Sequence, residues 1–383
     1  MLQLAVAVAT TSLVLVTGVK GILGLGPAIF LASGALSALP AGRLMDRFGR
    51  VPVLAGGFGI GIAGCCATAL GCGVDSAPLL IVGFVAVGSA MGIALLARTA
   101  AGDIYPPERR ARGISFVLFG AVFGAILGPT VFSPLFAGKE LDAQALVVPW
   151  LAAAGFMAVG LAIVLAVRPD PSRAGLSAST SASPEAAEPL GVILRRPGVP
   201  TALLAALSSF AVMVAVMNLT GYMMLGEGHM QSDVFPVISA HIVGMYGLVV
   251  VVGDLVDRIG RRAAIVGGLA TMGVSTLALA WTQSVLGTGI ALFGLGLGWS
   301  FSYVAATSAL VDLARPAERG RLIGFNDLLS GFTGAGLALL GGVAYAHAGT
   351  TSVAVGGAIA VALPALWIAV ARRPPGSLQE APA

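Results

Sequence analysis

Long apolar runs, separated by short charged or glycine-rich segments, extend from one end of the chain to the other. An apolar run of roughly 17 to 25 residues is long enough to cross the hydrocarbon core of a bilayer as a helix. The pattern predicts twelve such helices, at residues 2–19, 23–41, 52–72, 77–98, 113–136, 146–168, 200–225, 234–253, 263–282, 285–310, 322–346 and 350–371. We therefore expect an all-α, polytopic membrane protein.

Composition supports this prediction. Hydrophobic residues make up 57% of the chain and charged residues 10%, whereas about a quarter of the residues of a soluble domain are charged. The net charge of +4 does not indicate a nucleic-acid-binding protein, because the basic residues lie in short loops and form no continuous patch. Cys65, Cys66 and Cys72 share one apolar run with no His nearby, which favours packing over metal or disulfide bonding. We expect no metal and no cofactor.

The distribution of basic residues predicts the orientation. If the N-terminus lies inside, 19 of the 21 Lys and Arg residues fall in cytoplasmic segments, and only Lys20 and Lys139 lie outside. Such a bias is the usual determinant of membrane topology. We expect both termini in the cytoplasm, a location in the cell membrane, and a first helix that is retained rather than cleaved as a signal peptide.

Two bundles of six helices are expected, an N-terminal bundle at 1–168 and a C-terminal bundle at 200–373. The segment 169–199 is rich in Pro, Ser, Ala and Gly and predicts a cytoplasmic linker, and residues 374–383 predict a cytoplasmic tail. For residues 190–196 two interpretations stay open, a short interfacial helix and a plain flexible linker.

A charged loop between two predicted helices occurs twice. The pattern G-x-x-x-D-R-x-G-R spans residues 42–50 and returns 211 positions later at 253–261. A looser repeat joins residues 103–110 to 312–319, and each copy combines an Asp, a Pro, a Glu and Arg residues. We interpret the Asp residues of this second repeat, Asp103 and Asp312, as members of ion pairs that order a helix end. The repeats indicate two related halves.

The repeated loop resembles the signature loop of the major facilitator superfamily, whose members are secondary transporters built from two six-helix bundles that rock about a central cavity. The resemblance implies that the loop latches the cytoplasmic face against the opposite half. Solvated positive charge that serves only topology is the alternative. The latch residues would be Gly42, Asp46, Arg47, Gly49 and Arg50, with Gly253, Asp257, Arg258, Gly260 and Arg261.

The predicted fifth helix carries a second resemblance. Gly124, Gly128 and Pro129 form G-x-x-x-G-P, which is similar to a signature of the exporter branch, in which members exchange drugs or metabolites for protons. Small residues four apart permit close helix packing, and the proline bends the helix. The branch pattern continues with glycines, and here Val131 and Phe132 stand instead.

The fourth helix departs from the same branch. Its members carry an arginine four residues before a glycine in this helix, and the resemblance ties that arginine to proton coupling. Four residues before Gly88 this chain has Phe84, and Arg98 near the end of the helix is not an equivalent replacement. The sequence therefore gives no support for proton coupling through the usual arginine.

Few ionisable residues fall inside the predicted spans, and such residues are functional candidates by default. Asp327 and His241 are the candidates for proton coupling. For Asp327 the competing interpretation is a static gate in which the carboxylate stays ionised against Arg47 or Arg321. For His241 it is a structural histidine with satisfied hydrogen bonds.

Polar and aromatic residues recur at helical spacing on three predicted helices, and ordinary packing between helices is the alternative explanation for them. By analogy with the family these helices line the central cavity. The candidates for contact with the substrate are Asn218, Tyr222, Trp299, Tyr303, Asn326 and Ser330.

A cavity with few hydrogen-bonding groups suits a lipophilic or amphiphilic small molecule, because sugars or peptides require many buried polar partners. The sequence predicts a transporter rather than an enzyme, with a small molecule, a proton and the lipid bilayer as partners, no nucleic acid, and a monomeric state. Proton-coupled efflux by alternating access is the expected activity. An importer or uniporter of a small metabolite is the alternative, and a membrane-embedded sensor or enzyme is a third class.

The topology can be tested with single cysteines in a background that lacks Cys65, Cys66 and Cys72. A cysteine replacing Lys139 should react with an impermeant maleimide in intact cells, because Lys139 is expected outside. A cysteine replacing Ser179, in the predicted cytoplasmic linker, should react only after the cells are opened. Equal reaction of both in intact cells would contradict the predicted orientation.

Overall fold

A computed structural model describes residues 12–13, 15–18, 25–136, 143–172, 187–229 and 231–370. Within these residues, all regular secondary structure is helical. The predicted first helix therefore lies largely outside the described residues, as do Lys20 and Lys139. Seven described helices are long and apolar enough to cross a membrane, and an eighth span is formed if one bent pair is counted as a single span. The all-α membrane fold is confirmed.

Two compact units make up the chain. The first comprises Met1–Asp103, Phe123–Glu185 and Pro316–Leu328, and the second comprises Ile104–Val122, Ala186–Arg315 and Leu329–Ala383. Each unit thus includes a short segment from the other half of the sequence. The division into bundles at 1–168 and 200–373 stays a prediction.

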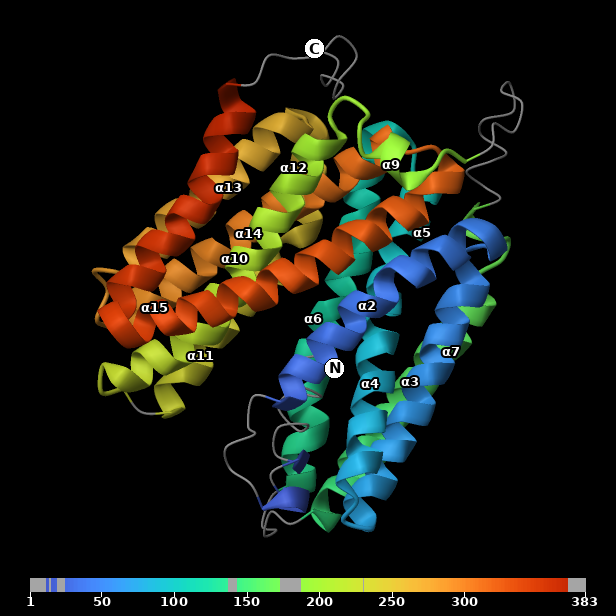
Figure 1. Cartoon of the computed structure of the whole chain (residues 1–383), viewed down its shortest axis with the longest axis vertical. Helices are drawn as coiled ribbons and strands as arrows, with labels where there is room; N and C mark the ends of the chain where they lie inside the picture. Colours follow the sequence, from blue (N-terminus) through green and yellow to red (C-terminus); the bar gives the residue numbers. More distant parts are fainter. Residues whose placement is uncertain are drawn as a thin grey trace. The chain divides into compact units, whose positions relative to one another are not determined.

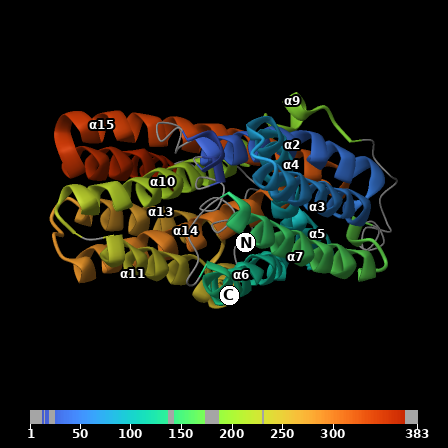
Figure 2. The same cartoon turned by 90° about the horizontal axis from the view of Figure 1, so that it is seen from below.

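In the first unit, α2 (Leu25–Phe48), α3 (Arg50–Gly73), α4 (Ala77–Leu95) and α7 (Val147–Ala166) pack side by side (Figures 1 and 2). A break at Leu96 separates α4 from the short helix α5 (Ala97–Ile104), so the fourth predicted span is interrupted near its end. The chain continues through η2 (Pro107–Arg109) into α6 (Arg110–Phe136), and η3 (Gln144–Leu146) precedes α7.

An aromatic cluster forms the core of the first unit. Phe84 of α4 lies between Phe30 and Trp150, with ring centroids 5.3 Å and 5.9 Å away. The indole N–H of Trp150 donates to the hydroxyl of Ser12 at 3.1 Å. Phe84, which stands where the exporter branch has its arginine, is thus fully buried in apolar packing. Cys65 and Cys72 are buried in the same cluster, whereas Cys66 is exposed.

In the second unit, α10 (Val199–Gly226), α11 (Gln231–Ile242) and α13 (Arg261–Ala278) pack around α14 (Val285–Leu313). Figure 2 shows these four helices together. The eighth predicted span is not one straight helix, because a π-helical turn (η4, Val243–Gly247) follows α11 and α12 (Val249–Ile259) leaves at a bend of 46°. Such turns occur frequently at functional sites.

The remaining elements are α9 (Leu190–Ile193), η5 (Pro316–Glu318) and α15 (Arg319–Val370). Residues 190–193 therefore form one helical turn, shorter than the predicted interfacial helix at 190–196. The eleventh and twelfth predicted spans are joined in α15 and separate at Ala348 and Gly349, whose backbone angles are not helical.

Glycines bring α2 and α4 into backbone contact. A Cβ atom at Gly92 would lie 2.2 Å from the carbonyl oxygen of Gly34, which leaves no room for a side chain. Gly56 on α3 has nothing within 4 Å of its ideal Cβ position. The two positions therefore differ in packing although both are helical.

We predict that Gly92→Ala lowers the stability of the detergent-solubilised protein by roughly 1–3 kcal/mol, because α2 and α4 must separate. Gly56→Ala is the matched control and should be neutral or stabilise by about 0.5–1 kcal/mol through its helix preference. Thermal unfolding midpoints of the purified variants measure both effects. An unchanged midpoint for Gly92→Ala would contradict the close helix contact.

Candidate functional site

The repeated loop is a break of one residue between two helices. α2 ends at Phe48 and α3 begins at Arg50, and Gly49 between them has φ +98°. In the second copy, Gly260 with φ +86° stands between α12 and α13. Positive φ favours glycine because it lacks a Cβ atom. The glycines therefore let the chain reverse within one residue, which places the Asp and Arg of the motif on either side of the turn.

Asp46 binds the beginning of α15. Its carboxylate accepts backbone N–H bonds from Gly320 at 2.9 Å and Arg321 at 2.7 Å, in the first turn of that helix. It also accepts from Nη1 of Arg50 at 2.9 Å. First-turn N–H groups have no partner inside their own helix, and the positive end of the helix dipole favours an anion there. Asp46 thus holds a helix that begins more than 270 positions later in the chain.

Arg50 links this contact to a second carboxylate. Its Nε donates to Asp103 at 2.7 Å and its Nη2 donates to the carbonyl of Pro316 at 2.9 Å. Arg319 donates to the other oxygen of Asp103 at 2.7 Å. The side chains of Arg50 and Asp103 are 1% and 0% exposed. We call Asp46, Arg50, Asp103 and Arg319, with the backbone groups that they bind, the first-unit network.

The second copy of the loop makes the equivalent contacts on α6. Asp257 accepts backbone N–H bonds from Ala111 at 3.2 Å and Arg112 at 2.9 Å, in the first turn of α6. It also pairs with Arg261. The arrangement repeats the contact of Asp46 with α15.

Arg261 again connects to a second carboxylate. It donates to Asp312 at 3.2 Å and to the carbonyl of Pro107 at 2.7 Å, and Arg110 donates to Asp312 at 2.6 Å. Asp312 is 25% exposed and therefore less buried than Asp103. We call Asp257, Arg261, Asp312 and Arg110, with their backbone partners, the second-unit network.

The first glycine of each motif allows the helices to meet. A Cβ atom at Gly42 would lie 2.1 Å from the carbonyl oxygen of Gly320, and one at Gly253 would lie 2.9 Å from that of Ala111. Arg47 and Arg258 are exposed, and no ion pair of theirs is seen in the described part of the chain. These two arginines lie beside the networks rather than in them.

Asp170, which sequence analysis assigned only to the linker, caps α3. Its oxygens accept backbone N–H bonds from Arg50 at 3.1 Å and Val51 at 2.8 Å and bonds from the backbone and hydroxyl of Ser172. Burial alone would raise the pKa of Asp170, but these hydrogen bonds favour the carboxylate and lower the pKa below its usual value. Asp170 is therefore ionised at neutral pH and ties the chain after α7 to the repeated loop.

Asp327 of α15 pairs with Arg98 of α5, not with Arg47 or Arg321 as the sequence suggested. Its Oδ1 accepts from Nη2 of Arg98 and from the side-chain amide of Asn326, the latter at 3.2 Å. Arg98 also donates to the carbonyl of Leu95 at 2.7 Å. The side chains are 0% exposed for Arg98 and 8% for Asp327. The structure thus places a buried ion pair between these two helices.

Aromatic rings from three elements gather in the second unit. Trp299 and Tyr303 of α14 stack at 4.7 Å with 15° between their planes, and Tyr246 of the π-helical turn meets Trp299 edge-on at 5.7 Å. Phe210 of α10 lies 6.2 Å from Tyr303. The indole N–H of Trp299 is buried and has no hydrogen-bond partner in the described part of the chain.

His241 is fully buried and precedes Tyr246 in the sequence by more than one helical turn. Its Nδ1 lies 2.9 Å from the carbonyl oxygen of Leu292, which can only accept, so Nδ1 carries the proton. Nε2 is then left as an acceptor without a partner among the described residues. Half of the hydrogen-bonding capacity of this histidine is therefore satisfied.

The other candidates are scattered. Asn326 and Ser330 of α15 are buried, and Asn218 of α10 is exposed. Tyr222 belongs to α10, but its side chain lies outside the described part. The α6 helix continues through Gly124, Gly128 and Pro129, whose surroundings likewise lie outside it.

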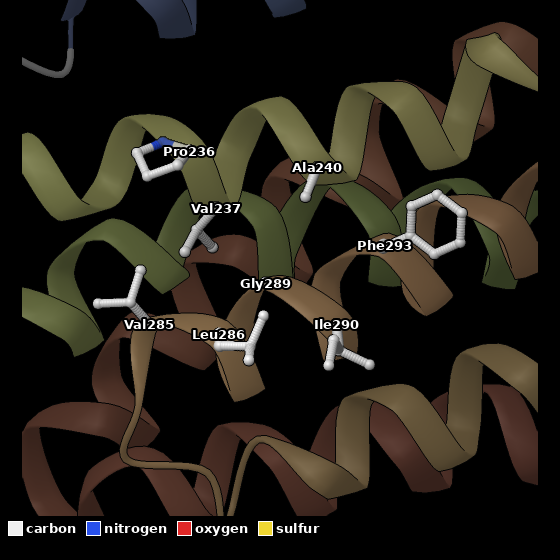
Figure 3. A pocket seen from close by; sticks show the side chains of 8 residues that line it. All are labelled: Pro236, Val237, Ala240, Val285, Leu286, Gly289, Ile290 and Phe293. Atoms are coloured by element: carbon white, nitrogen blue, oxygen red, sulfur yellow. The ribbon is translucent and has the colours of Figure 1, made fainter.

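An apolar groove of about 520 Å³ lies between α11 and α14 (Figure 3). Pro236, Val237 and Ala240 of α11 face Leu286, Ile290 and Phe293 of α14 across it. Leu286 and Ile290 are more than half exposed, as expected for side chains that contact lipid. The groove has no polar side chain and none of the candidate residues, so it is not the site that the sequence predicted.

The two networks predict an unequal response to loss of a carboxylate. Asp103→Asn removes the buried carboxylate that Arg50 and Arg319 share, although Arg50 keeps its pair with Asp46, and should destabilise the protein by roughly 3–5 kcal/mol. Asp312→Asn, at a position that is more exposed, should cost about 1–2 kcal/mol less. Thermal unfolding in detergent compares the two variants. An equal loss of stability in the two variants would contradict the prediction that the more buried carboxylate contributes more.

Comparison with known proteins bears on the whole chain. The model of the Major Facilitator Superfamily matches residues 4–335 and 237–383. The chain is 30% identical over 355 residues to the uncharacterized MFS-type transporter YddS of Bacillus subtilis (strain 168), covering 89% of this chain and 80% of the relative. It is 30% identical over 306 residues to the riboflavin transporter RfnT of Brucella anthropi, covering 77% of this chain and 73% of the relative.

A solved structure agrees with the fold. The fucose:proton symporter FucP of E. coli superimposes with a TM-score of 0.75 over 96% of both chains at 16% identity. The repeated loop, the paired networks that it forms and the match along nearly the full length lead to one conclusion. The chain is a membrane transporter of the Major Facilitator Superfamily.

Proposed function

We propose that the chain is a proton-coupled secondary transporter that exports a small lipophilic or amphiphilic molecule by alternating access. The observation that carries the proposal is the pair of networks in which Asp46 and Asp257 bind the first turns of α15 and α6. Ionic and backbone groups at helix ends can be rehydrated when a contact opens, whereas apolar packing exposed to water is penalised. The networks are therefore suited to contacts that break and re-form in each cycle.

The substrate class follows from the second unit. Trp299, Tyr303 and Tyr246 offer aromatic surface with few hydrogen-bonding groups, and the buried N–H of Trp299 offers one donor. Such a mixture suits a molecule with an apolar body and few polar atoms. The relative named as a riboflavin transporter supports a planar, amphiphilic substrate for this chain too.

Proton coupling is assigned to Asp327, with His241 as the second candidate. Both are buried, and each has a hydrogen-bonding atom without a partner among the described residues, Oδ2 of Asp327 and Nε2 of His241. When a carboxyl or imidazole group inside a span gains or loses a proton, the local charge changes, and a charge inside the membrane has a large free-energy cost. Asp46 and Arg50, with their counterparts Asp257 and Arg261 in the second copy, act in closing the networks, and Arg47 and Arg258 lie beside them.

Import is the second candidate for the direction of transport. The G-x-x-x-G-P pattern of α6 supports export. The riboflavin transporter among the relatives supports the alternative, an importer or uniporter of a small metabolite. The proposal also includes the membrane orientation in which both termini lie in the cytoplasm.

Everted membrane vesicles with an acidic lumen separate the two directions. Riboflavin and the planar dye ethidium serve as fluorescent probes. Export by proton exchange should accumulate at least one probe in the lumen, and a protonophore should abolish this accumulation. Asp46→Asn should reduce it by roughly tenfold at equal expression, because a buried charged hydrogen-bond acceptor is lost.

Asp254→Asn is the control, because Asp254 belongs to neither network and pairs with the exposed side chain of Arg112, whose backbone N–H still binds Asp257, so transport should be unchanged. Depletion of the probe from an acidic lumen would favour import. Accumulation that is equal in the parent and in Asp46→Asn would refute the role given to the networks.

A further inference from the structure

The two networks correspond residue by residue, but the buried Arg98–Asp327 pair has no counterpart. The offset of 209 positions that relates Asp103 to Asp312, and Pro107 to Pro316, places Thr307 opposite Arg98 and Leu118 opposite Asp327. Thr307 and Leu118 are both buried, at 0% and 6% exposure. Where the first unit buries two charges, the second buries a hydroxyl and an alkyl group.

This difference supplies an internal comparison. Burying an ion pair is often no more stabilising than burying well-packed apolar groups of similar size, because both charges lose their hydration. At the related positions of the second unit, α6 and α14 bury the uncharged side chains of Leu118 and Thr307. Helix packing therefore does not require the Arg98–Asp327 pair, and ionisable residues inside a span are functional by default.

The geometry provides an acceptor for a proton. Oδ1 of Asp327 accepts from Arg98 and Asn326, whereas the buried Oδ2 has no hydrogen-bond partner among the described residues. A proton that binds Oδ2 neutralises the carboxylate and removes the counter-charge of Arg98. Arg98 keeps its hydrogen bond to the carbonyl of Leu95, so its Nη1 still has an acceptor. The attraction between α5 and α15 then weakens.

The charged groups around Asp327 are otherwise engaged or exposed. On α5 the next one is Asp103, which is bonded to Arg50 of α3 and Arg319 of α15. On α2, which packs against α15 at Gly324, Asp46 is bonded to the first turn of α15. The other charged side chains of these elements are Arg43 and Arg47, which are exposed, and Arg321. Arg98 is thus the counter-ion that a change at Asp327 affects first.

We infer that the Arg98–Asp327 pair is a proton-binding lock for the first unit, which releases the start of α15 when Oδ2 of Asp327 is protonated. Asp327 lies six residues after Arg321, about 9 Å along α15 at 1.5 Å per residue. Release of the helix here loosens the turn that Asp46 holds. The second-unit network lacks this element, so the proton acts on one of the two networks. The inference rests on the proposed function for its purpose, but the release itself can be measured without substrate.

The experiment measures the accessibility of a buried position beside the lock. Ile323 of α15 is 0% exposed, and Ile323→Cys is made in a background without the native cysteines. Maleimide labelling is followed in everted vesicles as the pH is lowered from about 8 to about 5.5. Because maleimide reacts with the thiolate, whose fraction falls as the pH is lowered, each rate is divided by the rate at the exposed position Glu108→Cys.

In the parent, acidification should raise the normalised labelling by roughly tenfold. Asp327→Asn, which mimics the protonated acid, should label fast at every pH. The double variant Arg98→Thr with Asp327→Leu copies the second unit and should show no pH response. Asp254→Asn, at the exposed pair, should respond as the parent does.

A flat response in the parent, or an unchanged pH response in Asp327→Asn, overturns the inference, as does loss of the response in Asp254→Asn. If the double variant does not fold, Asp327→Asn decides alone, because it preserves the shape of the side chain. Probe accumulation in vesicles is measured in parallel. If labelling responds to pH through Asp327 but no proton-driven transport of a probe is seen, the transport proposal is refuted and the lock stands. If proton-driven transport is seen but labelling does not respond to pH, the lock is refuted and the transport proposal stands.

Discussion

A carboxylate at the N-terminus of a distant helix is the interaction on which both units depend. Asp46 and Asp257 each accept two backbone N–H bonds from the first turn of a helix in the other half of the sequence. The helix dipole and the unpaired N–H groups favour the anion, and the arginine four residues later balances its charge. Gly42 and Gly253 permit this contact because their missing side chains let backbones meet.

The networks also explain how the sequence divides between the two units. The start of α15 clusters with the first unit and the start of α6 with the second, and these are the helix starts that Asp46 and Asp257 bind. A contact made of charges and backbone groups at helix ends is specific in geometry and can be replaced by water. Reversible closure in a transporter needs both properties.

Much of this could be predicted from sequence, for physical reasons. Apolar runs reveal membrane helices because the bilayer admits little else. The repeated motif located the networks, and the looser second repeat suggested ion pairs at Asp103 and Asp312. The partner of Asp327 could not be predicted, because Arg98 lies 229 positions away and the pair is absent from the second repeat. The capping role of Asp170 was hidden in a segment with linker composition, and the π-helical turn at 243–247 leaves no periodic signal in an apolar run.

Hydrogen exchange at the two helix starts tests the central claim most directly. In Asp46→Asn, the amides of Gly320 and Arg321 lose their charged acceptor and should exchange faster than in the parent by roughly tenfold. Those of Ala111 and Arg112 should change less, and Asp257→Asn should give the opposite pattern. Unchanged exchange at Gly320 and Arg321 in Asp46→Asn would contradict the account, because it would mean that this carboxylate does not hold the start of α15.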